Sequence, residues 1–249
     1  MFIKLNILAF AILSALLTSQ FCAAADFSVA GGAGYSSSPY KKYDVYVLPL
    51  PILSFDSKYF YMRGLGAGVH LWKDGQQTLS LGVSYHWQRF KHDKTDDRRL
   101  KQLSSRHDSI NAELQYVVRG DYGRLKLAVF QDILDHSNGL SAEATYSYPF
   151  RPGKFYLSPG IGVRWESSDV LDYYYGISGK EASRSGLPRY KAEEGFSPFL
   201  FLESAYPLNK KWSLISAARA MQLSKEIKDS PMVDDTWMYS VFAGVNYSF

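Results

Sequence analysis

Two adjacent residues, His136 and Ser137 in the stretch LDHSNG (134–139), are the most obvious candidates for hydrolytic chemistry. A histidine can take a proton from a serine hydroxyl only when the two side chains meet, which on a strand requires a spacing of two residues. Adjacent strand residues point to opposite faces. Asn138 and Gly139 instead supply the positive φ angles that hairpin turns need. We therefore predict a polar turn, and a lipid-active enzyme is the weakest of three functional classes.

Candidates for metal or cofactor chemistry are weaker still. The glycine-rich stretch RGLGAG (63–68) is followed by no predicted helix, so it does not match a phosphate-binding loop and is more typical of a bend or close packing. The only cysteine is Cys22. We predict no catalytic residue, no metal and no cofactor. The five histidines lack the spacing of metal ligands: His70, His86, His92, His107 and His136.

Six charged residues fall on the predicted polar faces of strands. Buried ionised groups need partners, so the mixture of both signs predicts a network of ion pairs and hydrogen bonds. A charged constriction in a conducting pore is the alternative. The six are Glu113, Glu143, Arg164, Glu166, Glu203 and Arg219.

Strands must position these side chains, because apolar and polar residues alternate along much of the chain. In WMYSVFAGVNYSF (237–249) every second residue, from Trp237 to Phe249, is apolar. A period of two places the two sets on opposite faces. About ten residues suffice for a tilted strand to cross a bilayer. The same alternation recurs in TLSLGVSYHWQ (78–88), INAELQYVV (110–118), LSAEATYSYPF (140–150) and FYLSPGIGVRWE (155–166).

The first residues predict export. Lys4 precedes an apolar run that is too short to span a membrane comfortably, and three alanines follow at 23–25. We predict a signal peptide over 1–25, cut after Ala25, and a single domain over 26–249. The net charge of +4 is too balanced to indicate a nucleic-acid partner.

The apolar faces end in aromatic residues, such as Tyr85 and Trp87 or Tyr247 and Phe249, as expected for girdles where a barrel meets the membrane surfaces. We therefore predict an all-β fold, an antiparallel transmembrane β-barrel in the outer membrane of a Gram-negative bacterium, in contact with its lipid. Eleven segments alternate, and a division at RGLGAG would give about twelve strands; ten is the alternative. A soluble periplasmic β-sandwich is the competing fold.

Short and long connections also alternate. Tight turns at 119–123, 150–154 and 207–211 are predicted to face the periplasm, and long loops at 91–108, 167–195 and 224–235 to lie outside. Structureless loops as long as 167–195 are uncommon unless they are functional. The tyrosines of loop 167–195 could anchor this loop in the barrel or bind a partner.

This loop carries a family resemblance. YYYGISGKEASRSGLPRY (173–190) resembles the signature of the MipA/OmpV family of MltA-interacting proteins, and so do RGLGAGVHLW (63–72), SPGIGVRW (158–165), KDSPMVDDTW (228–237), LDHSNG and the terminal Phe249. The signature residues are Tyr173, Tyr174, Tyr175, Gly176, Glu181, Arg184, Ser185, Gly186 and Tyr190.

The resemblance implies a non-enzymatic scaffold that links a murein lytic transglycosylase to a penicillin-binding peptidoglycan synthase. A porin-like channel or a surface adhesin is the alternative. Phe249 resembles the aromatic ending that the outer-membrane assembly machinery reads. Periplasmic partners would reach only the turns and rim on that side, so we predict docking through a basic set: Arg119, Arg124, Arg151, Lys154, Lys210 and Lys211.

Overall fold

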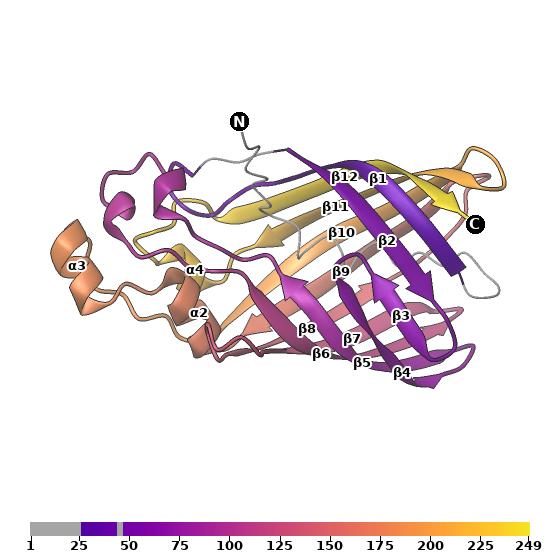
Figure 1. Cartoon of the computed structure of the whole chain (residues 1–249), viewed down its shortest axis with the longest axis horizontal. Coiled ribbons are helices and arrows are strands. Elements are labelled where there is room, and N and C mark those ends of the chain that lie inside the picture. The colour runs from indigo at the N-terminus through magenta and orange to yellow at the C-terminus, as the bar shows by residue number, and fades with distance from the viewer. Residues whose placement is uncertain (1–25, 44–46) are drawn as a thin grey trace.

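The computed structural model describes residues 26–43 and 47–249, and the predicted signal peptide over 1–25 lies outside them. Twelve strands form a closed antiparallel barrel, with β12 pairing to β1 (Figure 1). The predicted barrel of twelve strands is confirmed. The strands are β1 (Asp26–Ser36), β2 (Leu48–Asp56), β3 (Phe60–Arg63), β4 (Gly66–Lys73), β5 (Gln77–His86), β6 (Ser109–Gly120), β7 (Gly123–Asp132), β8 (Leu140–Ser147), β9 (Tyr156–Glu166), β10 (Gly195–Pro207), β11 (Trp212–Gln222) and β12 (Trp237–Ser248).

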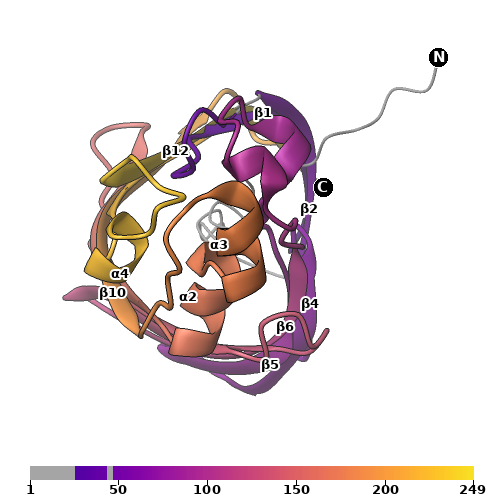
Figure 2. The same ribbon diagram turned by 90° about the vertical axis from the view of Figure 1, so that its left-hand side faces the viewer.

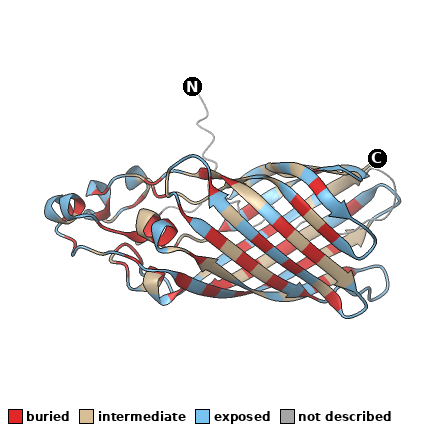
Figure 3. Ribbon diagram, turned by 90° about the horizontal axis from the view of Figure 1, so that it is seen from below, coloured by how far each residue is buried: buried red, intermediate tan, exposed pale blue. Residues whose placement is uncertain are grey.

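The alternation directs apolar side chains out of the barrel. Leu81, Leu114 and Val163 are 46%, 45% and 36% exposed on strands whose neighbouring residues are more buried. Figure 3 shows this alternation of exposed and buried positions along the strands. A two-sheet sandwich would enclose these three residues between its sheets. Because they are exposed, the apolar sides of these strands form the outer, lipid-facing wall of the barrel.

The twelfth strand comes from the predicted division at RGLGAG. Gly64 adopts φ 59°, a left-handed conformation that glycine takes without a steric cost, and turns the chain between β3 and β4. β5 ends two residues before the alternating segment TLSLGVSYHWQ (78–88) does. The chain turns after His86, where the Gln88 amide donates to the His86 carbonyl at 3.0 Å. Trp87 consequently packs against a buried cluster of the outer loops and not in a lipid-facing girdle.

The interior has two unlike walls. Strands β5 to β9 direct mainly polar side chains inward, as predicted, among them Ser80, Gln115 and Glu143. Strands β10 to β12 and β2 direct apolar ones inward, including Phe199 and Phe242. The polar lumen predicted from alternation is therefore present along β5 to β9. Along β10 to β12 and β2 the prediction is only partly right, because apolar residues also occupy inward positions there.

The long connections gather at one end of the barrel. They contain η1 (His92–Lys94), η2 (Leu100–Gln102), α2 (Ser168–Tyr175), α3 (Gly179–Ser185) and α4 (Lys225–Lys228). Viewed from that end, α2 and α3 lie within the outline of the barrel (Figure 2). The long loop 167–195 is thus a helical element across the mouth. No helix in the described part of the chain is long and apolar enough to cross a membrane.

Candidate functional site

Three outer loops converge on the carboxyl end of α2. The last carbonyls of a helix lack partners within the helix and must find them elsewhere. Here the Tyr173 carbonyl accepts from Arg106 Nε at 2.6 Å, the Tyr174 carbonyl from the Tyr40 hydroxyl at 3.3 Å, and the Tyr175 carbonyl from Ser230 Oγ at 2.7 Å. Loops far apart in the sequence are therefore fixed to three consecutive carbonyls. We call this assembly of loops 37–43, 87–108, 167–195 and 223–236 the outer cap.

Arg106 is the central cation of the outer cap. Its guanidinium also donates to the Gly176 carbonyl at 3.1 Å and forms a buried ion pair with Glu181, with Nη1 3.0 Å from Oε1. Burial acts to raise the pKa of Glu181, but the hydrogen bonds from Arg106 and from backbone amides outweigh it and lower that pKa to about 2. Glu181 therefore stays ionised and bound to Arg106 across the physiological pH range.

The signature residues around Glu181 build α3 and attach it. The Glu181 carboxylate accepts from the Ser178 amide at 3.0 Å, and Ser178 accepts from the Glu181 amide, forming a capping box. Gly186 ends the helix at φ 68°, in the left-handed region that glycine adopts without strain. Arg184 reaches across to Ser104 Oγ at 2.7 Å, and Ser185 Oγ donates to the Glu181 carbonyl.

Further hydrogen bonds close the outer cap on its other sides. The Tyr190 hydroxyl donates to the Glu226 carbonyl at 2.7 Å, Lys41 Nζ to the Pro231 carbonyl at 2.9 Å, and Thr95 Oγ1 to the Lys41 carbonyl at 2.7 Å. The predicted signature residues are thus brought together with one another and with three other loops.

An apolar core lies beneath these polar contacts. Tyr40, Phe90 and Tyr174 are buried and pack with inward residues of the barrel, Phe199 and Phe242, in one cluster. The Tyr40 ring lies 5.0 Å from Phe90 and 5.6 Å from Tyr175. Burial also raises the pKa of Tyr174, whose hydroxyl donates to the His107 carbonyl at 3.0 Å. The tyrosines of the signature therefore anchor the loop against the barrel interior, one of the two roles predicted for them.

The six charged residues predicted to line the lumen lie on inward strand positions, and five of them form ion pairs with one another or with a neighbour. Arg219 lies 3.2 Å from Glu143, Arg164 lies 3.3 Å from Glu166, and Glu203 lies 3.9 Å from Arg124. The predicted ion-pair network is present, and it connects β7, β8 and β9 of the polar wall to Glu203 of β10 and Arg219 of β11. The Arg219 guanidinium also stacks over Phe199, 3.4 Å from the ring centroid, where the two walls meet.

His136 and Ser137 are not brought together as base and nucleophile. His136 Nδ1 hydrogen-bonds the Asp108 carbonyl at 2.9 Å, and Ser137 Oγ donates to the Asp132 carboxylate at 3.1 Å. Asn138 adopts φ 56°, as the predicted turn requires. Within residues 26–43 and 47–249, no group of three His, Cys, Asp or Glu side chains is arranged to hold a metal ion.

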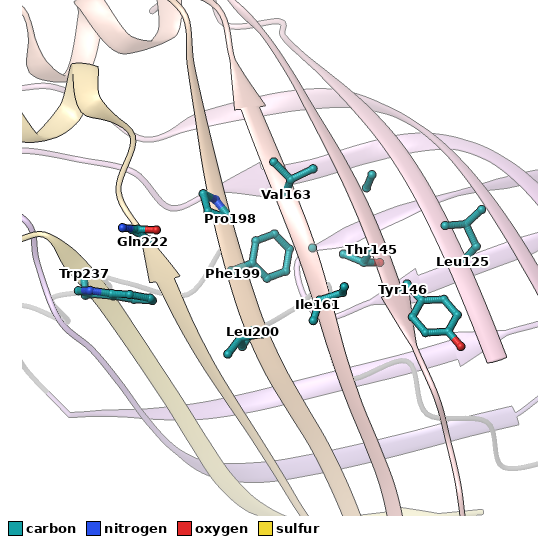
Figure 4. Close-up of a pocket in the computed structure, with 12 residues that line it drawn as sticks. Leu125, Thr145, Tyr146, Ile161, Val163, Pro198, Phe199, Leu200, Gln222 and Trp237 are labelled. Carbon is teal, nitrogen blue, oxygen red and sulfur yellow. The ribbon is translucent and has the colours of Figure 1, made fainter. Parts of the chain in front are cut away.

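A groove of about 470 Å³ lies over strands β8 to β10 (Figure 4). Outward-facing Ile161, Val163 and Leu200 line it, with Trp237 at one end, and no charged residue contributes to its lining. Such a lining suits the lipid-facing wall and offers no group for acid–base chemistry.

The six predicted docking residues separate into two sets. Arg119 and Arg124 turn into the barrel, where Arg119 Nη1 donates to Thr78 Oγ1 at 3.1 Å and Arg124 faces Glu203. The other four are exposed on two periplasmic turns, and we call them the basic rim: Arg151, Lys154, Lys210 and Lys211.

The two turns of the basic rim are neighbours on the barrel. Phe155, after the first turn, packs on Tyr206, before the second, with ring centroids 4.8 Å apart. No acidic residue occurs in 148–154 or 207–212. On the opposite part of the rim, by contrast, Asp56 pairs with Arg63 at 2.9 Å and with Lys73. Exposed positive charge is thus concentrated on the part of the rim formed by β8 to β11.

Phe249 lies beside the seam that closes the barrel. Its amide donates to the Phe27 carbonyl at 3.2 Å, and the two rings are 4.9 Å apart. Its side chain is 73% exposed. The role predicted for it in assembly stays a prediction.

The most connected residue of the outer cap, Arg106, was not a candidate from sequence. It lies in a charged stretch with no alternation, and its partner Glu181 is 75 residues away. Tyr40 was missed for the same reason. The inward direction of Arg124, in contrast, could have been found, because outward Leu125 and Leu127 fix the parity of β7.

A closed barrel with an apolar outer wall, aromatic residues at the ends of its strands and a polar interior face defines an outer-membrane β-barrel protein. The family model of the MltA-interacting protein MipA matches residues 29–249, and the chain belongs to this family.

Relatives agree with this assignment. The chain is 37% identical to the MltA-interacting protein of Escherichia coli K12, over 99% of both chains, and 32% identical to the putative outer membrane protein YiaT of the same strain, over all of both. It is 27% identical to OmpV of Vibrio cholerae, over 70% of this chain and 65% of that one. Among solved structures, an outer membrane channel from Pseudomonas putida F1 aligns with a TM-score of 0.46 and 9% identity, over 94% of this chain and 98% of that chain.

Proposed function

We propose that this protein is a non-enzymatic scaffold of the outer membrane that binds a murein lytic transglycosylase and, with it, a penicillin-binding peptidoglycan synthase. The observation that carries the proposal is the basic rim, four exposed cations on neighbouring turns at the end of the barrel opposite the outer cap. The name of the 37% identical relative, MltA-interacting protein, supports a partner of this kind.

The charge at the basic rim suits such a partner. Exposed cations on turns that contain no acidic residue attract an acidic surface and guide its approach, and they contribute more to the association rate than to affinity. The aromatic residues beside them, Phe155, Tyr206 and Trp212, add apolar contact area at the rim. We therefore expect binding that weakens as salt concentration rises.

The proposal is tested by reversing the four charges of the basic rim to glutamate and measuring capture of purified transglycosylase and synthase, separately and together. We expect transglycosylase capture to fall strongly, with synthase capture falling only where it depends on the transglycosylase. The control reverses four exposed cations at the outer end: Arg98, Lys180, Arg189 and Lys191. Equal capture by both reversed variants, each correctly inserted, would contradict the proposal.

A channel is the second candidate, and the inward-facing charged residues of β8 to β11 favour it. Planar-bilayer recordings test it. A channel should show unitary conductance that changes when Glu203 or Arg219 is neutralised, and a pure scaffold should show none.

A further inference from the structure

The barrel wall is incompletely paired between β2 and β5. β2 pairs with β1 from Leu48 to Asp56, but with β3 only over Ser54–Asp56. β3 has four residues and turns into β4 at Gly64, part-way up the wall. Figure 1 shows β3 ending well short of the outer end of β2. The wall therefore has two fewer strands in its outer part at this position.

The ends of the hairpin mark where the pairing stops. The Gly64 amide donates to the Leu53 carbonyl at 2.9 Å, and the Tyr85 amide donates to the Leu65 carbonyl at 3.1 Å. Above these bonds, no described residue forms a backbone hydrogen bond with the side of β2 that faces away from β1 over residues 48–52. Five strand residues span about 17 Å, a large part of the hydrocarbon thickness.

Two prolines lie on this edge. Alternate residues of an antiparallel strand direct their amides to opposite neighbours, and the Leu53 carbonyl faces β3. Pro49 and Pro51 therefore direct their nitrogens to the same side, where the wall has no partner. Proline carries no N–H, and an unpaired N–H in hydrocarbon costs several kcal/mol. The sequence thus removes two N–H groups that this edge would leave unpaired. Only the carbonyls of Pro49 and Pro51 face the gap there, which lowers the cost of a lipid-exposed edge.

Both faces of β2 at this gap are apolar. Outward, Pro51, Leu53 and Leu65 are exposed. Inward, Leu48, Leu50 and Ile52 are half-buried and pack against the apolar cluster under the outer cap. Leu50 is the register partner of Gly32, and a side chain at Gly32 would meet the Phe242 ring. On its β2 side the gap thus leads from lipid to the apolar wall of the barrel, while its other edge is β5, whose inward residues Ser84 and His86 are polar.

We propose that the gap between β2 and β5 is a lateral site in which an acyl chain of a membrane lipid enters the wall and lies against Leu48, Leu50 and Ile52. An acyl chain fits because both faces of β2 at the gap are apolar, and because the surrounding bilayer supplies it at high concentration. This site is independent of partner binding at the basic rim.

The test places a nitroxide at Leu50 in the full chain, with Cys22 replaced by serine, and measures its collisions with oxygen and with a water-soluble nickel complex in phospholipid vesicles. Two positions serve as references: Leu200, which is 58% exposed on the outer wall, and Ala128, which is 2% exposed and faces inward behind a fully paired wall. Each is labelled through the corresponding cysteine substitution.

We expect the Leu50 label to collide with oxygen as often as the Leu200 label, several times more often than the Ala128 label, and rarely with nickel. A phospholipid with a second nitroxide in its acyl chain should broaden the Leu50 spectrum. Low accessibility to both reagents, or high accessibility to nickel, would overturn the proposal. Ile52→Cys repeats the measurement should Leu50→Cys insert poorly.

Discussion

The two ends of this barrel use charged residues in opposite ways. At the outer end, Arg106 and Glu181 are buried, paired and surrounded by backbone hydrogen bonds. At the periplasmic end, the cations of the basic rim are exposed, with no acidic residue in their turns. The buried pair at the outer end joins segments of the same chain, whereas the cations of the basic rim are exposed to solvent.

This difference teaches how to separate structural from interaction roles among charged loop residues. Removing one residue of a buried ion pair is costly, because the charge of the other residue stays buried without a partner. An exposed cation contributes little to stability and acts mainly on approach and binding. Substitutions at the two ends should therefore affect different measurements.

The largest expected effect comes from Arg106→Ala. It leaves the Glu181 carboxylate buried without its cation and releases the Tyr173 and Gly176 carbonyls. We expect the outer cap to lose about 3–5 kcal/mol of local stability. Hydrogen exchange of residues 170–190 should accelerate strongly, with strand exchange unchanged. Arg99→Ala, at an exposed site nearby, is the control, and equal protection in the two variants would argue against a structural role for Arg106.

Acidification should loosen the same contact. The pKa of Glu181 is lowered to about 2 in the folded protein, against about 4.3 in an unfolded chain. Its contribution is therefore complete above the unfolded pKa and is lost as the pH falls toward 2. The near-ultraviolet circular dichroism of the buried tyrosines should report this loss. Glu181→Gln should weaken the outer cap at neutral pH and flatten the loss of circular dichroism on acidification. If the variant shows the same acid transition as the unchanged protein, Glu181 is not the group responsible for it.

Ser178→Ala should have a smaller effect. It removes the capping side chain of α3, which typically costs about 1 kcal/mol. Ser183→Ala is the matched control on the same helix, because the Ser183 hydroxyl is exposed and bonds only the Gly179 carbonyl. Exchange of the α3 amides should increase in the first variant alone.

The smallest effect on stability is expected at the basic rim. Its fourfold reversal to glutamate should change the free energy of unfolding by no more than about 0.5 kcal/mol per site. Heat-induced loss of the folded species on gels measures this. A large drop in melting temperature would remove the contrast between the two ends and would also complicate the capture experiment.

The fold could be predicted because a strand in a bilayer must alternate with a period of two, and residues such as Leu81 and Leu114 obey it. The outer cap could not be predicted in detail. Its hydrogen bonds join residues such as Tyr40 and Tyr174, 134 positions apart, and backbone carbonyls accept them whatever the side chain. The apolar wall was missed for two reasons. Phe242 stands between Ser240 and Gly244 on its face, which favours a polar lumen, and Phe199 lies in the apolar run PFLFL (198–202), where alternation does not distinguish the two faces.

The three carbonyls at the end of α2 accept hydrogen bonds through the main chain, so spacing matters there more than residue identity. A helix rotates by about 100° per residue. Deleting one residue between Ser168 and Tyr173 would therefore swing all three acceptors away from Arg106, Tyr40 and Ser230 together. Relatives that keep this arrangement should tolerate substitutions in α2 far better than insertions or deletions.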